Sequence, residues 1–394
     1  MIQISDNTQQ IQPSKIRKMF NKALEYDHVI SFTLGEPDFT ASPNVVEAGC
    51  RAIREGKTKY SENAGLLALR QAIAEYLHRT EGLSYDPASQ IVVTPGAMGA
   101  LFLALKVLLN PGDEVIVNEP CWTNYVQQIR MCGGVPVSVK TNAQRGFDLD
   151  VSAIAEAVTD KTKAIILNSP CNPTGAVAST ETLLQLAELA QKQDLVILAD
   201  EVYKHILFDG RTYTSFASLP GMKERTLVID SLSKTYAMTG WRIGFIAAPL
   251  WIAKACNKLQ GQYTSGASSI AQKAAAAAFA GEQGCVETMR QAFQHRRDLV
   301  VRLAKEIPGL KVNDPQGAFY LFPEVSHYLG KSDGERKINT SSDLAMYILE
   351  VGHVATVAGD AFGAPNYLRL SYATSEENIT EAMRRMKEVL ARLK

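Results

Sequence analysis

The sequence has few cysteines, and they form no pattern typical of a disulfide framework or a metal site. Its six cysteines are scattered over 394 residues, without a Cys-x-x-Cys motif and without histidines at the spacing that binds zinc. We therefore expect reduced thiols, as in a cytoplasmic protein, and no bound metal.

The sequence also lacks an excess of one charge and any long apolar run. Lysine plus arginine and aspartate plus glutamate number 41 each, whereas proteins that bind nucleic acids or membrane surfaces carry a basic excess. The apolar stretch Ala97–Leu109 contains Lys106 and is too short to span a bilayer. The first residues show no signal-peptide pattern. These absences predict a cytoplasmic protein that binds neither nucleic acid nor membrane.

From about residue 90, short β-branched runs alternate with helical patterns. Near-continuous apolar strands separated by helices are typical of a mostly parallel sheet covered on both faces. The sequence thus predicts an α/β fold whose large domain holds a seven-stranded sheet between helices. The expected strands are Ile91–Thr94, Glu114–Val117, Pro136–Val139, Ala164–Leu167, Leu195–Ala199, Thr226–Ile229 and Gly244–Ala247.

After about residue 285 the pattern changes to a long charged helix, Gly284–Ile307, followed by helices and by short strands that include Phe319–Pro323 and Ala355-Thr-Val. This change predicts a smaller α+β domain. A chain of 394 residues is long enough for two domains. We expect an N-terminal arm that forms part of the small domain at residues 1–44, a large domain at 45–285 and the small C-terminal domain at 286–394.

The most informative stretch is Ser231-Leu-Ser-Lys-Thr-Tyr-Ala-Met-Thr-Gly-Trp-Arg-Ile-Gly244, which follows a predicted buried strand. Ser231, Ser233 and Arg242 are the short donors and planar cation that bind a phosphate monoester. Beside a bound phosphate, Lys234 is either a counter-charge or, if desolvated, an amine nucleophile. The four residues Ser231–Lys234 alone also fit an ordinary polar turn.

The full stretch resembles the cofactor-binding lysine segment of class I/II aminotransferases, the fold-type I pyridoxal-phosphate enzymes. Further motifs follow in family order over nearly the whole chain: Leu34-Gly-Glu-Pro-Asp38, Pro95-Gly-Ala-Met-Gly99, Asn172-Pro-Thr-Gly175, Asp200-Glu-Val-Tyr203 and Tyr367-Leu-Arg-Leu-Ser371. The resemblance implies that pyridoxal 5'-phosphate is bound covalently to Lys234 in the large domain.

The resemblance also implies which residues hold the cofactor. The phosphate would be bound by the backbone N–H groups of Ala97 and Met98 together with Ser231, Ser233 and Arg242. Trp122 would stack on the ring, and Asn172 and Tyr203 would donate to its phenolic oxygen. Asp200, which would be costly at the end of a buried strand without a partner, would pair with the pyridine nitrogen. From the residues alone, Trp122 also fits a core position and Asp200 a helix cap.

For the substrate, the resemblance implies that Arg369 binds the α-carboxylate, with Gly35 close to the same group and Trp122 and Asn172 also in contact. An arginine fork fits a carboxylate bidentately. Tyr60 matches a family tyrosine that reaches the phosphate of the neighbouring subunit's cofactor. The resemblance therefore implies a homodimer whose active sites are shared.

The implied reaction moves the amino group of an L-amino acid to a 2-oxo acid, with 2-oxoglutarate as the expected acceptor. Aspartate-preferring relatives have a lysine where this chain has Met98, so aromatic, aspartate and longer acylated donors all stay open. A carbon–sulfur β-lyase of the same fold is the nearest alternative. A non-catalytic regulator that keeps the cofactor is disfavoured, because the first thirty residues are too short for a DNA-binding region and the catalytic set is intact.

Overall fold

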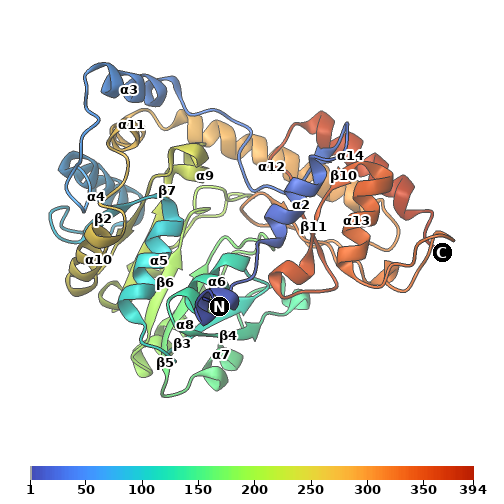
Figure 1. Cartoon of the computed structure of the whole chain (residues 1–394), viewed down its shortest axis with the longest axis horizontal. Coiled ribbons are helices and arrows are strands. Elements are labelled where there is room, and N and C mark those ends of the chain that lie inside the picture. The colour runs from blue at the N-terminus through green and yellow to red at the C-terminus, as the bar shows by residue number, and fades with distance from the viewer. Residues whose placement is uncertain (1) are drawn as a thin grey trace.

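The computed structural model describes residues 2–394 and contains the predicted sheet. Its seven strands run in the order β2-β8-β7-β6-β5-β3-β4 (Figure 1), and β8 is antiparallel to both neighbours, whereas the other pairings are parallel. The strands are β2 (Ile91–Thr94), β3 (Glu114–Glu119), β4 (Val135–Lys140), β5 (Thr162–Asn168), β6 (Val196–Asp200), β7 (Thr226–Ser231) and β8 (Gly244–Ala247). The α/β class and the mostly parallel seven-stranded sheet are confirmed.

Helices cover both faces of this sheet because its strands are apolar on both sides. Along β3, Val115 and Val117 pack into one apolar cluster while Ile116 packs into another, as the two-residue period of a strand requires. The helices around the sheet are α3 (Pro43–Arg54), α4 (Leu67–Glu81), α5 (Gly96–Leu108), α6 (Thr123–Met131), α7 (Val151–Ala157), α8 (Thr180–Lys192), α10 (Leu250–Tyr263) and α11 (Ser269–Ala280).

The C-terminal elements form a second apolar core beside the sheet (Figure 1). The long helix α12 (Gly284–Lys305) packs along α14 (Glu376–Leu390), whose apolar side is buried. A three-stranded antiparallel sheet joins β9 (Tyr320–Leu321), β11 (Val357–Ala358) and β12 (Leu368–Ser371), and α13 (Ser341–Gly352) packs on it.

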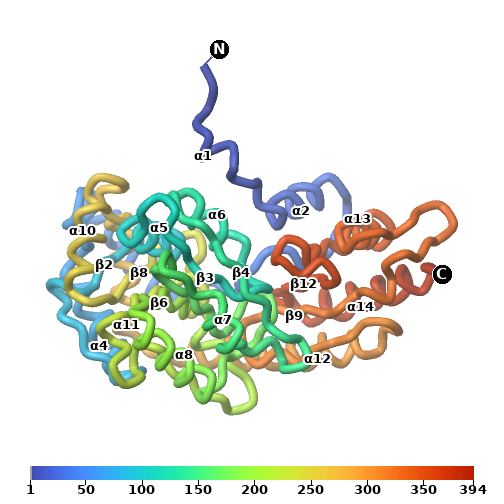
Figure 2. The backbone as a smooth tube through the Cα atoms, turned by 90° about the horizontal axis from the view of Figure 1, so that it is seen from below, coloured from blue at the N-terminus to red at the C-terminus, as the bar shows by residue number. Residues whose placement is uncertain are grey.

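The N-terminal segment runs back to these C-terminal elements. Strand β1 (Ile30–Ser31) pairs in parallel with β10 (Val354–Ala355). Figure 2 shows α2 (Lys15–Ala23) beside α13. The preceding helix α1 (Asp6–Gln9) contacts α6, where the Asn7 side chain donates a hydrogen bond of 3.2 Å to the carbonyl oxygen of Met131. The pairing of β1 with β10 agrees with an N-terminal arm that joins the small domain, although the exact domain boundaries stay a prediction.

Three sequence predictions of local structure need correction. The run Ala355-Thr-Val, expected as one strand, is divided at Thr356 between β10 and β11, which belong to different sheets. The strand expected at Phe319–Pro323 is reduced to β9. The helices α7, α10 and α11 were not predicted, because segments such as the alanine run of α11 show little contrast between polar and apolar faces.

Within residues 2–394, no helix has both the length and the apolar character that a membrane crossing requires.

Candidate active site

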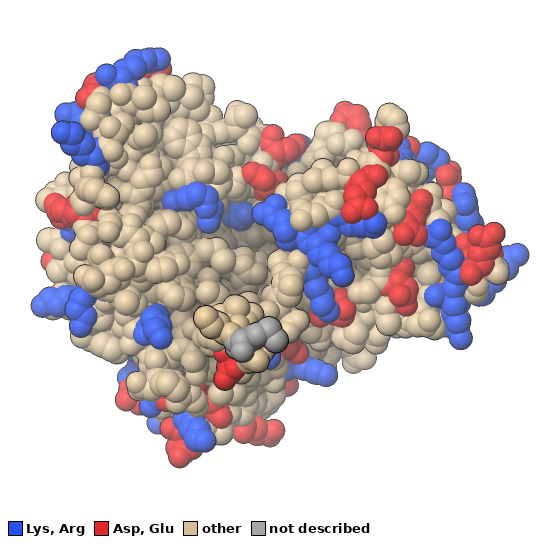
Figure 3. All heavy atoms as spheres, in the orientation of Figure 1, with Lys and Arg blue, Asp and Glu red and all other residues tan. Residues whose placement is uncertain are grey.

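A cavity of about 560 Å³ lies where the carboxyl ends of β5, β6 and β7 face the C-terminal elements. Figure 3 shows the corresponding hollow in the middle of one face, with lysine and arginine side chains along its rim. Ligands of open parallel sheets bind at this edge. The predicted site residues that line the cavity are Gly35, Ala97, Met98, Trp122, Asn172, Asp200, Tyr203, Ser231, Ser233, Lys234, Arg242 and Arg369.

One end of the cavity is rich in groups that can bind an anion. Helix α5 begins there without a side-chain cap, so the first N–H groups of the helix are available to a ligand. Gly96 has φ 73°, and a Cβ at this position would lie 2.7 Å from Nη2 of Arg242. A Cβ on Gly244 would lie 2.6 Å from the backbone nitrogen of Ala97. The two glycines thus let Arg242 and the start of α5 come together, and this end fits a phosphate monoester.

Lys234 lies in the short helix α9 (Leu232–Thr235), directly after β7. Its Nζ donates a hydrogen bond to the carbonyl oxygen of Gly35, and no carboxylate of the described chain forms an ion pair with it. The pKa of Lys234 is lowered from 10.5 to about 8, chiefly by burial; Glu36 acts in the other direction, and Arg242 and Arg369 add to the lowering. The amine is therefore partly neutral near pH 8, as a nucleophile or a general base must be.

Asp200 ends β6 and is buried, with 5% of its surface exposed. Tyr125 donates a hydrogen bond of 2.6 Å to its Oδ2. Burial raises the pKa of Asp200 from 3.8 to about 6, although the hydrogen bonds from Tyr125 and from the backbone of Val202 act in the other direction. At neutral pH this carboxylate is ionised, and no lysine or arginine within residues 2–394 forms a salt bridge with it. A buried anion in this state favours a ligand that brings a positive charge.

Arg369 on β12 is almost completely buried and forms no ion pair with a carboxylate of residues 2–394. It donates through Nη1 to Oδ1 of Asn172 at 2.9 Å and through Nη2 to the carbonyl oxygen of Thr33. The rings of Tyr320 and Phe362 lie 4.6 and 4.9 Å from its guanidinium carbon. Its Nε has no hydrogen-bond partner among the described residues. A buried guanidinium with a free donor is suited to bind the carboxylate of a ligand.

Two tyrosines in the site were not predicted from the sequence. Tyr125, which holds Asp200, is one helical turn beyond Trp122 in the segment already singled out. Tyr320 on β9 shares a hydrogen bond of 2.7 Å with the hydroxyl of Tyr203, and a Cβ on Gly35 would lie 1.8 Å from that Tyr320 oxygen. Nothing in the sequence distinguishes Tyr320 from other apolar strand residues.

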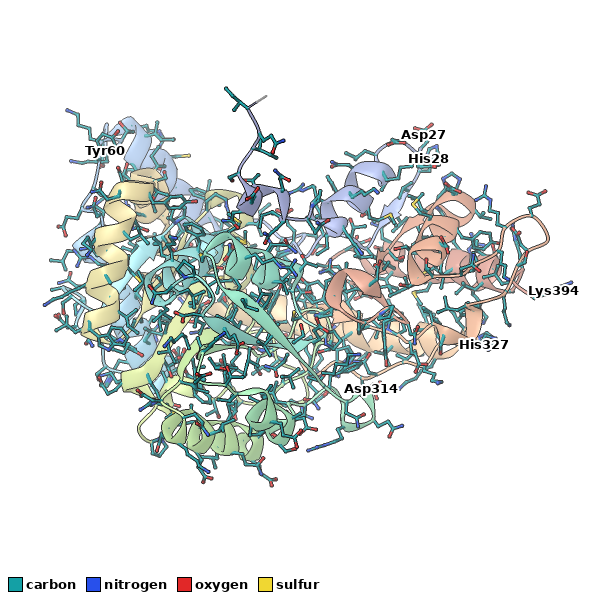
Figure 4. The ribbon with its side chains drawn as sticks, turned by 60° about the horizontal axis from the view of Figure 1, so that its bottom comes forward. Asp27, His28, Tyr60, Asp314, His327 and Lys394 are labelled. Carbon is teal, nitrogen blue, oxygen red and sulfur yellow. The ribbon has the colours of Figure 1, made fainter. Side chains whose placement is uncertain are left out.

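Tyr60 lies outside the cavity. It is 93% exposed and projects from the edge of the molecule, far from Lys394 (Figure 4). A single chain does not bring Tyr60 to its own site, so its role across a subunit interface stays a prediction.

The donor set fits pyridoxal phosphate on structural grounds. The uncapped start of α5 with Arg242 suits the phosphate, the unpaired Asp200 suits a protonated ring nitrogen, and the partly neutral amine of Lys234 suits a covalent link. All three border one cavity.

Comparison with known proteins agrees with this geometry. Residues 27–386 match the family described as aminotransferase class I and II. A relative from Petunia hybrida, named a bifunctional aspartate aminotransferase and glutamate/aspartate-prephenate aminotransferase, is 43% identical over 403 residues, which cover 100% of this chain and 84% of that protein. A probable aspartate/prephenate aminotransferase from Aquifex aeolicus is 44% identical over 92% of this chain and 91% of its own length.

Solved structures show the same likeness. The aspartate aminotransferase from Rhizobium meliloti has a TM-score of 0.96 and 39% identity, with 100% of both chains covered. The aromatic aminotransferase from Pyrococcus horikoshii has a TM-score of 0.88 and 40% identity over 94% of this chain and 98% of its own. The chain therefore belongs to the class I and II aminotransferases, and it is an enzyme of this pyridoxal-phosphate-dependent family.

Proposed function

We propose that the chain binds pyridoxal 5'-phosphate covalently at Lys234 and moves the amino group of an L-amino acid to a 2-oxo acid by a ping-pong reaction. The observation that carries this proposal is the partly buried amine of Lys234, which forms no ion pair with a carboxylate of residues 2–394 and borders the same cavity as the unpaired carboxylate of Asp200. When bound there, the cofactor supplies an electron sink for the charge that develops on the substrate's Cα.

The phosphate group is held by the backbone N–H groups of Ala97 and Met98 and by Ser231, Ser233 and Arg242. This assignment is supported by the uncapped start of α5 and by the close approach of Arg242 to Gly96. The assignment accounts for a glycine at position 96. Gly96 adopts a positive φ, and because it has no Cβ it leaves the space beside Arg242 clear.

The ring is held by contacts on its face and its edges. Trp122, at the start of α6, stacks on one face and limits its tilt. Asp200 keeps the ring nitrogen protonated, and its hydrogen bond from Tyr125 fixes the direction of the carboxylate. Asn172 and Tyr203 donate to the phenolic oxygen, and the Tyr320 hydroxyl holds the Tyr203 hydroxyl in place.

Arg369 binds the α-carboxylate of the substrate and thereby orients Cα toward Lys234. With the cofactor bound, the amine of Lys234 would act as the general base that takes the proton from the substrate's Cα. A pKa near 8 keeps a useful fraction of this amine neutral at physiological pH.

We also propose a homodimer in the cytoplasm. Tyr60 projects from the molecule, so a second copy that contributes this hydroxyl to the phosphate site is consistent with its exposure. Light scattering of the purified protein tests the dimer. Replacing Tyr60 with phenylalanine should weaken cofactor binding without changing the fold, whereas unchanged cofactor affinity in that variant contradicts the shared site.

For the donor, the names of the relatives include aspartate, glutamate and aromatic amino acids. Prephenate, which these names also contain, has no amino group to donate. Met98 brings no charge to the cavity. Aromatic, aspartate and longer acylated amino acids are therefore all donors to be tested, with 2-oxoglutarate as the acceptor.

The test is a half-reaction screen. The cofactor-loaded protein is mixed with single L-amino acids, and the absorption spectrum is followed without any 2-oxo acid. Conversion of the cofactor to its amine form, with one equivalent of 2-oxo acid released, supports transamination. Continuous release of pyruvate and ammonia from a sulfur-containing amino acid identifies a β-lyase instead, and no reaction with any amino acid contradicts both.

A further inference from the structure

The cavity contains one cation that none of the roles above uses. Four basic side chains line it: Arg17, Lys234, Arg242 and Arg369. Lys234, Arg242 and Arg369 each donate a hydrogen bond within the site. In the described part of the chain, the guanidinium of Arg17 has no hydrogen bond or ion pair, and its carbon lies 5.4 Å from the centre of the Phe20 ring.

The position of Arg17 is fixed by the start of α2. Ser14 caps this helix and accepts a hydrogen bond from the backbone N–H of Arg17. Lys15 pairs with Asp360 at 2.8 Å, which anchors the turn and leaves Lys15 already neutralised. Because Lys15 has a carboxylate and Arg17 has none, Arg17 is the group in this turn that can bind an incoming anion.

The turn that begins α2 also packs against the apolar residues that surround Arg369. Ile16 packs against the apolar cluster that contains Phe322 and Phe362, and the ring of Phe362 lies 4.9 Å from the guanidinium carbon of Arg369. Arg17 and Arg369 therefore border one cavity from two connected elements, and each guanidinium lacks a carboxylate. An acid with a carboxylate at each end fits this arrangement, since each end then meets an arginine.

We infer that Arg17 is a specificity-determining residue that binds the distal carboxylate of a dicarboxylic substrate, such as a five-carbon or four-carbon amino or 2-oxo diacid. This inference rests on the proposed function, because it assumes that Arg369 binds the α-carboxylate. Arg17, on the N-terminal helix α2, supplies the positive charge that the uncharged side chain of Met98 lacks. The distal carboxylate and the Arg17 guanidinium form a charge-assisted pair at the mouth of the cavity, while apolar side chains contact Met98 and Trp122 instead.

The test compares binding of two unreactive acids to the cofactor-loaded protein by titration calorimetry. Glutarate has two carboxylates, whereas valerate has the same chain length and only one. The variants are Arg17→Met, which removes the charge at similar length, and Arg17→Lys. The control is Lys18→Met, because Lys18 is an exposed neighbour on the same helix that does not line the cavity.

We expect Arg17→Met to weaken glutarate binding by about 10- to 100-fold, the loss typical of a charge-assisted hydrogen bond. Valerate binding should stay within about twofold, as should both acids in Lys18→Met. Arg17→Lys should recover part of the glutarate affinity. In the half-reaction, kcat/KM for glutamate or aspartate should fall with Arg17→Met, while kcat/KM for phenylalanine should not.

Two results overturn the inference: equal losses for glutarate and valerate, which indicate a structural role, and unchanged glutarate affinity in Arg17→Met. Both results leave transamination by the unmodified protein intact, so they do not affect the proposed function. The proposed function fails separately, if the unmodified protein converts no amino acid.

Discussion

Two lysines follow neighbouring strands of the sheet, Lys204 buried and Lys234 partly buried, and their surroundings are opposite. Lys204 lies four residues after β6, and Lys234 lies three residues after β7. Lys204 has three carboxylates around it, Glu81 at 2.5 Å, Asp230 at 2.9 Å and Glu201 at 3.4 Å. Lys234 has a carbonyl oxygen and no carboxylate partner among the described residues.

The titration of the two amines follows from this difference. Burial opposes the charge of each lysine. Around Lys204, Asp230 and Glu81 outweigh burial and raise its pKa well above the ordinary value. At Lys234 burial prevails, with help from Arg242 and Arg369, and the pKa falls to about 8.

The comparison shows how one fold uses the same side chain for two purposes. The paired lysine stays charged and connects β6, β7 and α4 through Asp230 and Glu81. The unpaired lysine is left with a reactive amine in an open cavity. Buried charge without a partner thus marks the reactive part of this molecule, and buried charge with partners marks its structural support.

The largest expected effect is on catalysis. Replacing Lys234 with alanine removes the amine that we propose to hold the cofactor and to move the Cα proton, so turnover should fall by about 10⁴-fold or more. Single-turnover kinetics and the loss of the absorption band of the lysine-bound cofactor measure this effect. Transamination at a comparable rate in Lys234→Ala contradicts the assignment.

The next effect is on stability and concerns the other lysine. Replacing Lys204 with methionine leaves Glu81 and Asp230 buried without their cation, which should lower the free energy of unfolding by about 3–5 kcal/mol. Denaturant titration of the cofactor-free protein measures it.

The same substitution at Lys234 is the matched control. In the folded chain the pKa of Lys234 is about 8, below the ordinary lysine value of 10.5. The charged amine therefore destabilises the folded state at pH 7. Lys234→Met should therefore stabilise the cofactor-free protein there, by an amount on the order of 3 kcal/mol that disappears as the pH rises from about 8 to 10.5. If both methionine variants shift stability in the same direction, the contrast between the two lysines is wrong.

A slightly smaller effect is expected at Asp200. Its folded pKa of about 6 lies above 3.8, so between these values the unfolded chain releases a proton that the folded chain keeps. Ionised Asp200 thus destabilises the cofactor-free protein by on the order of 3 kcal/mol above pH 6, and not below pH 3.8.

Asp200→Asn should accordingly raise the unfolding temperature of the cofactor-free protein at pH 7.5, and the gain should shrink as the pH falls through 6. The variant should also lose activity, which separates stability from function at this position. A gain that does not depend on pH contradicts the role given to burial.

The smallest effect concerns the rate at which the cofactor-free protein binds pyridoxal phosphate covalently. Because the neutral amine reacts, this rate should rise about tenfold per pH unit below about 8 and level off above it. Stopped-flow absorbance measures the profile. A rise that continues to pH 10 indicates that burial does not lower the pKa of Lys234.

The sequence predicted most of the fold because the strands of a covered parallel sheet are apolar along their whole length. Runs such as Ile91–Thr94 and Gly244–Ala247 are strands at the predicted residues. It also predicted twelve of the 24 residues that line the cavity, since they follow strands directly or belong to recognisable motifs. Tyr320 and Arg17 could not be predicted, because a short strand residue and a surface arginine carry no local pattern.

By itself the sequence determined the strands, their helices and the reactive residue types that stand at the strand ends, because apolar periodicity and short motifs are local properties. Only the tertiary structure decided which charges are left unpaired. Lys204 and Lys234 are both single lysines after a strand. Their chemistry differs because Glu81, far away in the chain, pairs with Lys204, whereas no carboxylate of the described residues pairs with Lys234. The balance between desolvation and a charged partner is set by packing, and packing joins residues that no local pattern connects.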